Sequence, residues 1–230
     1  MARLFPKLPD LVTVCADHKC KDYTYKNFHR LKIMERKSWS VLDYLWERRN
    51  KYRSEFSINI GFDLAPRCLA IHFDEKAVDD TRVIWDRIVN VVSERIRPTY
   101  AIGYAMLYYE GPASFAQGLA SSRYATVDRT FYGTPDILRK RSFEFVRTFL
   151  NRDRSELNNK IRDVFVFNLL SRSHLDRPVK GTTLEKWIIA NSAGELKPHS
   201  DDTWIWQVPP ADIEKIRAPL IQAGVTVVTK

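Results

Sequence analysis

Hydrophobic and polar residues alternate along the first third of the chain in a way that is typical of β-strands. A short strand is predicted around Val12–Ala16. The stretch SEFSINIGFD alternates three apolar residues with polar ones, which predicts a half-buried strand carrying Phe56, Ile58 and Ile60 on one face. LAPRCLAIHF follows as its expected hairpin partner. Gly61, Asp63 and Pro66 are expected to supply the turn that joins the two strands.

Three longer segments carry apolar residues at helical spacing instead. SWSVLDYLWERRNKY, residues 38–52, is predicted to be a helix capped by Ser38 or Ser40, with a buried stripe of Trp39, Leu42 and Trp46. DTRVIWDRIVNVVSERI predicts a second helix that Pro98 ends, with a stripe of Ile84, Ile88, Val91 or Val92, and Ile96. TPDILRKRSFEFVRTFL predicts a third, with Thr134 as its cap and Pro135 at its first position.

The last third alternates strand and helix patterns. YAIGYAMLYY and DVFVFNLLS predict strands, and TTLEKWIIAN predicts a short helix with a threonine cap. TWIWQV is expected to be a strand with Trp204 and Trp206 on one face, PPADIEKIRAPLIQAG a helix that ends at Gly224, and VTVV a closing strand. This pattern predicts a single α+β domain with a mixed or antiparallel sheet and helices mainly on one face. We expect residues 1–53 to form a basic, aromatic segment packed on a domain of residues 54–230.

Composition limits the function classes. The chain has 230 residues, of which 44% are hydrophobic and 12% aromatic, enough for one sizeable core. Its longest apolar run is far shorter than the roughly 20 residues of a membrane span, so no membrane partner is expected. Three cysteines without an export signal predict reduced thiols and a cytoplasmic location. The formal net charge of +9 is compatible with nucleic acid, an anionic surface or an acidic protein as partner.

The stretch CADHKC concentrates possible chemistry in six residues. Cys15, His18 and Cys20 are potential zinc ligands, but zinc sites need a fourth ligand and no second Cys or His pair exists. The four-residue gap between the cysteines also differs from the Cys-x-x-Cys spacing of redox enzymes. The favoured interpretation is therefore ordinary thiols at the end of a strand, with no metal site.

A second pattern resembles the metal site of restriction-type nucleases. Asp136 and the Glu195-Leu196-Lys197 triplet match an acid followed by Glu-x-Lys, in which two carboxylates hold a divalent cation. We expect Asp136 to serve as a first-turn helix acid and the triplet to lie in a turn, because Gly194 and Pro198 flank it. A metal-dependent nuclease or basic nucleic-acid-binding protein is therefore the alternative function.

Common cofactor motifs are absent from the sequence. It has neither a glycine-rich phosphate loop nor the Gly-x-Ser-x-Gly or His-Glu-x-x-His patterns of hydrolases. With only 8 glycines, backbone cradles for nucleotides are scarce. We expect no cofactor and no catalytic residues.

Tyrosine and arginine gather instead in YAIGYAMLYY and SSRYATVDRTFYG. These residue types dominate protein interfaces, and they also stack on single-stranded bases. A surface of this kind favours a macromolecular partner over a small substrate. The predicted partner-binding residues are Tyr108, Tyr109, Arg123, Tyr124, Arg129 and Tyr132.

In layout the chain from about Phe56 to Val228 resembles bacterial immunity proteins of polymorphic and type VI secreted toxins. The resemblance lies in WDRIVNVVSERIRPTYAIGYAMLYYE, in RDVFVFNLLSRSHLDRPVKGTTLEKWI and in WIWQVPPADIEKIRAPLIQAGV. It implies a non-catalytic cytoplasmic protein that binds a cognate toxin and blocks it. Residues 1–50 have no counterpart in the resemblance, and the basic charge differs from the acidic character of inhibitors of basic nucleases.

Overall fold

The computed structural model describes the chain in several stretches. They are residues 8–16, 19–30, 41–50, 53–61, 68–73, 78–105 and 159–229, together with Phe115 and, between residues 140 and 147, residues 140, 141, 144, 145 and 147. Of the strands at 41–50 and 53–61, and of residues 15, 16, 19, 20 and 68, the backbone alone is described. The chain divides into two compact units: residues 1–96 with 112–117, and residues 97–111 with 118–230.

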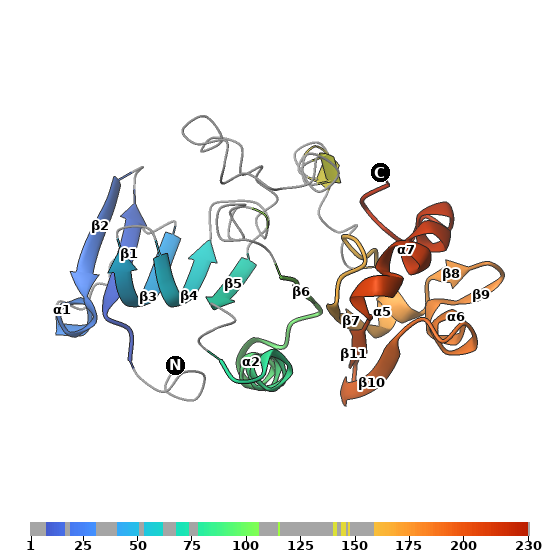
Figure 1. Ribbon diagram of the computed structural model, residues 1–230, viewed down its shortest axis with the longest axis horizontal. Coiled ribbons are helices and arrows are strands. Elements are labelled where there is room, and N and C mark those ends of the chain that lie inside the picture. The colour runs from blue at the N-terminus through green and yellow to red at the C-terminus, as the bar shows by residue number, and fades with distance from the viewer. Residues whose placement is uncertain are drawn as a thin grey trace. The chain divides into compact units, whose positions relative to one another are not determined.

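The first unit is built on a five-stranded antiparallel sheet with the order β2-β1-β3-β4-β5 (Figure 1). Its strands are β1 (Leu11–Ala16), β2 (Lys19–Thr24), β3 (Val41–Asn50), β4 (Arg53–Gly61) and β5 (Cys68–Phe73). The strands predicted at residues 12–16 and 56–60 are confirmed. So is the hairpin, because β4 pairs with β5 from Phe56 opposite Phe73 to Gly61 opposite Cys68.

The predicted helix at residues 38–52 is wrong. Val41–Asn50 is the strand β3, which pairs with β1 on one side and β4 on the other. Leu42, Tyr44 and Trp46 recur every second residue, which is the period of a strand. The same segment therefore fits the spacing of a strand and the spacing of a helix. Pairing on both edges decided the structure, because a central strand satisfies all its backbone groups. The predicted division after residue 53 falls within β4, which begins at Arg53.

The helices α1 and α2 accompany this sheet. Helix α1 (Tyr25–Arg30) follows β2 directly, and the Tyr25 N–H donates to the Asp10 carbonyl at 3.2 Å (Figure 1). Helix α2 (Thr81–Ile96) matches the prediction in its bounds. Its buried residue is Val89, whereas Ile96, expected in the buried stripe, is 58% exposed because it ends the last turn.

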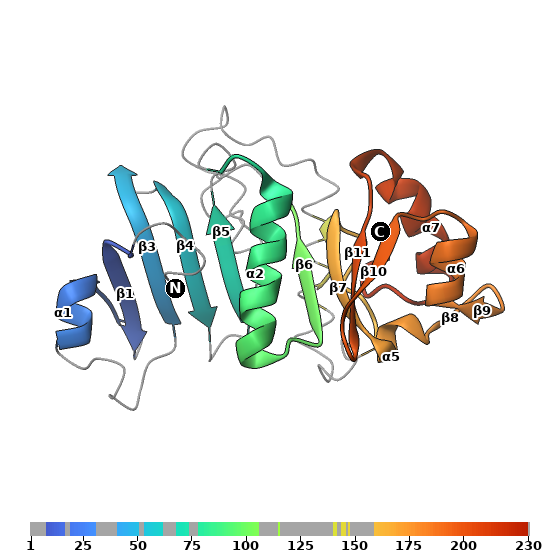
Figure 2. The same ribbon diagram turned by 90° about the horizontal axis from the view of Figure 1, so that it is seen from below.

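The second unit holds a four-stranded antiparallel sheet with the order β10-β11-β7-β6. These strands are β6 (Tyr100–Gly103), β7 (Phe167–Ser171), β10 (Glu195–Ser200) and β11 (Thr203–Gln207). Helices α6 (Leu184–Ala190) and α7 (Ile213–Gln222) lie on one face of it (Figure 2). The remaining elements are α5 (Arg172–Leu175), the two-residue strands β8 (Pro178–Val179) and β9 (Thr182–Thr183), and the 3-10 turn η7 (Pro210–Asp212).

The core of the second unit joins this sheet to α6 and α7. Its largest fully buried side chains include Trp206, Leu170, Leu184, Ile188 and Leu220. The indole N–H of Trp206 donates to the Ala193 carbonyl at 2.7 Å, so the ring is buried without losing its hydrogen bond. The predicted threonine cap is confirmed, because Thr183 Oγ1 accepts from the Lys186 N–H at 3.3 Å.

The closing strand predicted at residues 225–228 is not formed. The segment makes an isolated parallel bridge between Thr226 and Ile161, and the N–H groups of Val227 and Val228 donate to the carbonyls of Ile161 and Arg162. Its side chains are nevertheless buried. The apolar pattern of residues 225–228 therefore predicted their burial correctly. The pairing with Ile161 and Arg162 is too short to form a strand.

The α+β class with antiparallel sheets is confirmed. The predicted helix at residues 134–150 is helical at each position that the structure describes, and Phe145 there is buried. Thr134 and Pro135 lie outside the described residues. Within the described part of the chain, no helix has both the length and the apolar character to cross a bilayer.

Candidate functional site

The six predicted partner-binding residues all lie outside the described part of the chain, so that surface stays a prediction. They are Tyr108, Tyr109, Arg123, Tyr124, Arg129 and Tyr132. The described residues offer a second surface with similar chemistry. It lies in the second unit, where β7 passes into α5.

At the centre of this surface, an arginine lies on a tryptophan. Strand β7 ends at Ser171, which is opposite Thr203 in β11, and α5 begins with Arg172. The Arg172 N–H donates to the Asp202 carbonyl at 3.2 Å, which anchors the start of the helix to the β10–β11 turn. The guanidinium carbon lies 4.0 Å from the centre of the Trp204 ring, a cation–π contact.

Two carboxylates fix the same guanidinium. Arg172 Nη1 lies 2.6 Å from Glu185 Oε2 and 3.7 Å from Asp176 Oδ1. The hydrogen bond with Glu185 raises the pKa of Arg172, so the side chain keeps its charge throughout the physiological range. Its side chain is still 43% exposed, as is 31% of that of Glu185. The arginine is held in one orientation while it remains open to solvent.

An exposed aliphatic side chain adds to this surface. Ile189 stands four residues after Glu185 in α6, and residues at this spacing share one helix face. Ile189 is 68% exposed, so it adds apolar area to this helix face. We call the set Arg172, Asp176, Glu185, Ile189 and Trp204 the Arg172 surface.

Ser171 and the buried His174 form hydrogen bonds next to the Arg172 surface. The Ser171 N–H donates to Nδ1 of His174 at 3.2 Å, and the Ser171 hydroxyl lies 2.7 Å from the same nitrogen. Because an N–H can only donate, Nδ1 carries no proton and accepts from the serine. The His174 ring stacks on Tyr100 with centroids 5.2 Å apart.

This serine and histidine lie at the distance of a nucleophile and its base. However, His174 has no exposed surface, so a substrate could not reach it. The arrangement is instead a capping box at the start of α5. It fixes the backbone that carries Arg172.

A second charged group in this unit consists of two ion pairs, Arg217 with Asp163 and Arg141 with Glu214. Arg217 and Asp163, 4% and 8% exposed in their side chains, bind through Nε and Oδ1 at 2.5 Å. Burial raises the pKa of Asp163, and the hydrogen bond from Arg217 opposes that shift. Arg141 binds Glu214 with both terminal nitrogens at 2.8 and 2.9 Å, and this hydrogen bonding lowers the pKa of Glu214.

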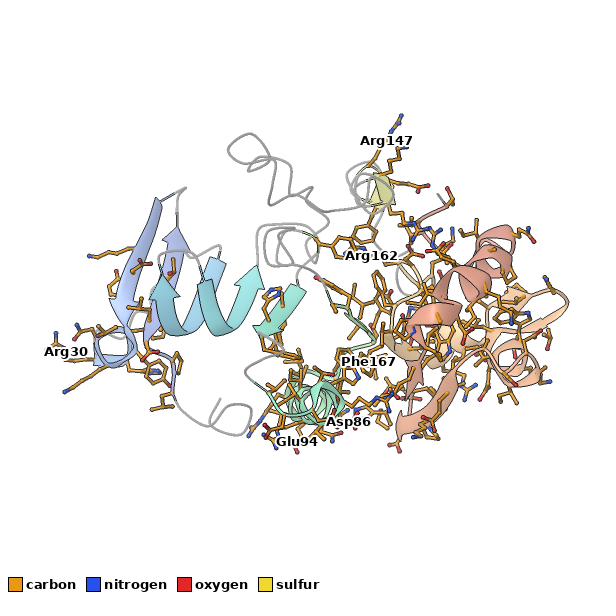
Figure 3. All side chains as sticks on the ribbon, viewed as in Figure 1. Arg30, Asp86, Glu94, Arg147, Arg162 and Phe167 are labelled. Atoms are coloured by element: carbon orange, nitrogen blue, oxygen red, sulfur yellow. The ribbon has the colours of Figure 1, made fainter. Side chains whose placement is uncertain are left out.

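Neighbouring contacts explain why these charges are structural. The guanidinium carbon of Arg162, labelled in Figure 3, lies 3.9 Å from the centre of the Phe145 ring. Glu144 accepts hydrogen bonds from the backbone and hydroxyl of Thr229. Arg141 is therefore tied to α7 through Glu214, and Glu144 to the carboxyl-terminal segment through Thr229. Both carboxylates of the paired group are engaged by arginines, which leaves neither poised as a general acid or base.

The prediction that the nuclease-like triplet Glu195-Leu196-Lys197 lies in a turn is wrong. The triplet lies on the strand β10. Glu195 pairs with Gln207 and Lys197 with Ile205 in β11, and β10 is an edge strand of the four-stranded sheet. Lys197 Nζ binds Glu195 Oε1 at 2.8 Å, and both side chains are exposed. Asp136, the other acid of the pattern, lies outside the described residues.

Of the cysteine stretch, Cys15 lies in β1 and is opposite Cys20 in β2. His18 lies outside the described residues. Among the residues that the structure does describe, no group of three or more His, Cys, Asp or Glu side chains is placed to hold a metal ion.

Comparison of the chain with protein-family models, with curated proteins and with solved structures found no match.

Sequence reasoning did not find the Arg172 surface. The signals were present but separate: a threonine cap ahead of Glu185, a strand with Trp204, and an arginine at the end of DVFVFNLLSR. Only the register of β7 and β11, with Trp204 opposite Leu170, brings them together. Such long-range pairing is not encoded in any short motif.

Proposed function

We propose that this chain is a non-catalytic binding protein, an immunity protein that neutralises a cognate secreted bacterial toxin in the cytoplasm. Two observations support the proposal. The layout and three stretches of the sequence resemble such proteins, and the Arg172 surface has the composition of a protein contact. The contact of Arg172 with both Trp204 and Glu185 carries the argument for binding.

That contact matters because binding costs entropy when flexible side chains are immobilised. An arginine that is already held between an aromatic ring and a carboxylate loses little freedom when a partner arrives. Tryptophan and arginine are also the residues that most often dominate interface energies. Ile189 adds exposed apolar area that a partner would bury.

The experiment pairs this protein with the product of its neighbouring gene. Expression of that product alone should arrest growth of a bacterial host, and co-expression of this chain should restore it. Purified proteins should form a complex by calorimetry. Arg172→Ala and Trp204→Ala should each weaken the complex about 10- to 100-fold, as hot-spot truncations do.

Lys186→Ala is the matched control. Lys186 is exposed on the same helix as Glu185 but outside the Arg172 surface, so its removal should leave affinity and rescue unchanged. Unaltered melting temperatures would show that the variants fold. Normal rescue by both Arg172→Ala and Trp204→Ala would remove this surface from the proposal. Failure of the intact chain to bind or to protect would reject the immunity function itself.

The alternative is a basic nucleic-acid-binding protein or metal-dependent nuclease. The net charge of +9 and the position of Glu195 and Lys197 on a strand favour it. Phosphate-driven binding should weaken steeply as salt rises from 50 to 200 mM, roughly 10³-fold or more for six to ten phosphate contacts. Cleavage that disappears in Asp136→Ala, Glu195→Ala and Lys197→Ala would establish the alternative in place of the inhibitor.

A further inference from the structure

Two of the three cysteines occupy directly opposing positions in the first hairpin. The register runs from Leu11 opposite Thr24 to Ala16 opposite Lys19, and places Cys15 opposite Cys20. Only Asp17 and His18 separate the two strands in the sequence. The two cysteines thus belong to adjacent strands at one end of the sheet.

A hydrogen bond at the far end of the hairpin identifies the type of pair. Opposing residues in an antiparallel ladder alternate between hydrogen-bonded and non-hydrogen-bonded pairs. The Tyr25 N–H donates to the Asp10 carbonyl, so Asp10 and Tyr25 form a hydrogen-bonded pair. Counting along the register makes Cys15 and Cys20 a non-hydrogen-bonded pair, the type whose Cα atoms lie closer, about 4.5 Å apart.

The neighbouring pair of the same type confirms the close approach. Thr13 and Asp22 stand two residues further along each strand, which is the same face of the sheet. Thr13 Oγ1 donates to Asp22 Oδ1 at 2.6 Å, so opposing side chains in this row do meet. A Cα separation of about 4.5 Å also falls within the range of about 4.4–6.8 Å that disulfides require.

The third cysteine cannot compete for either partner within the chain. Cys15 is opposite Val41, Val41 is opposite Gly61, and Gly61 is opposite Cys68. Cys68 therefore lies in the same row but three strands from Cys15, about 14 Å at about 4.8 Å per strand. That is well beyond the roughly 7 Å limit for a disulfide.

We propose that Cys15 and Cys20 form a reversible cross-strand disulfide when the cell becomes oxidising. One thiolate attacks oxidised glutathione, forms a mixed disulfide and releases one glutathione thiolate. The second cysteine thiolate then attacks the mixed disulfide at the protein sulfur and releases the other glutathione. Two protein thiols are oxidised and one glutathione disulfide is reduced to two thiols, so atoms and electrons balance.

The position makes this bond a reversible modification of the sheet edge. It closes a loop of only a few residues in a hairpin that is already paired, so it adds little to the entropy already lost by the strands. The disulfide clamps β2, the edge strand, onto β1.

The test uses the full-length chain in glutathione buffers that run from reduced to oxidised. Intact mass after rapid alkylation should show the loss of two hydrogen atoms and one alkylated thiol, Cys68. Trypsin cleaves after Lys19 and so separates the two cysteines, and a disulfide-linked peptide pair would identify the bond. Reduction by thioredoxin should restore three free thiols.

Two variants make the result specific. Cys68→Ser should form the same bond at the same glutathione ratio. Cys20→Ser should instead carry glutathione on Cys15 or form a dimer, since its partner is gone. Free Cys15 and Cys20 under oxidised glutathione, a bond to Cys68, or a zinc ion that protects both thiols from alkylation would each overturn the proposal.

Discussion

His72 is a half-buried titratable residue of the first unit. It lies in β5 opposite Ser57, and its Nε2 atom finds no hydrogen-bond partner among the described residues. Burial lowers the pKa of His72 to about 4, because a charged imidazole loses its hydration there. The histidine is therefore neutral in the folded protein at neutral pH.

This shift predicts how stability depends on pH. Below pH 6.5 the unfolded chain binds a proton at His72 that the folded chain rejects, so the free energy of unfolding falls as pH drops from 6.5 to 4. Above pH 6.5 the neutral His72 causes no loss in the free energy of unfolding. Below pH 4 the loss reaches at most about 3 kcal/mol. Urea unfolding at several pH values measures it.

His72→Phe supplies the control for this prediction. Phenylalanine resembles imidazole in shape and has no titratable group, so the acid-side fall should become shallower by that amount. An identical slope in both proteins would show that His72 is protonated equally in the folded and unfolded states.

At the level of elements, most of the fold followed from the sequence. Helices α2 and α6 were predicted because caps, periodicity and stops agree in them. Strand β3 was not, because its residues fit both periods and only pairing with β1 and β4 decides between them. The Arg172 surface was missed for the same reason, since the helices α5 and α6 and the strand β11 supply its residues. The pattern of residues within one segment does not determine which distant segments pair or pack with it.

Gly194 is required by the turn between α6 and β10. Its φ angle is +92°, and a Cβ atom there would lie 2.3 Å from the carbonyl oxygen of Gln207. Gly194→Ala should destabilise the second unit by about 2–4 kcal/mol, the strain of a positive φ plus displacement of the β10–β11 ladder. Chemical denaturation gives the value.

Gly181→Ala separates the two causes. Gly181 also has a positive φ, +82°, but nothing lies within 4 Å of a Cβ there. Its cost should be limited to the backbone term of roughly 1–2 kcal/mol. Equal losses in the two variants would mean that the Gln207 carbonyl moves aside freely.

For the whole molecule, the second unit depends on the end of the chain. Ile216, Leu220 and Val225 enter the core formed by β7, β11 and α6. Burial of such side chains contributes about 1.5–3 kcal/mol each, against a net domain stability of about 5–15 kcal/mol. The unit cannot lose all of them and stay folded.

A chain that stops at Pro209 should therefore lose the fold of its second unit. Hydrogen exchange should show that the amides of β7, β11 and α6 exchange at the rates of an unfolded chain. A chain ending at Thr229 is the control and should retain full protection. Persistent protection of the β7 amides in the shorter chain would contradict this prediction, because it would mean that the core folds without α7.

The buried pair of Asp163 and Arg217 also restricts how this sequence can change over time. Loss of either residue alone strands a charge in the interior, which typically costs 3–5 kcal/mol, whereas replacing both with apolar residues is often harmless. Descendants of this chain should consequently keep or discard the two together. A set of diverging sequences would reveal the link as correlated substitution at two positions that are 54 residues apart.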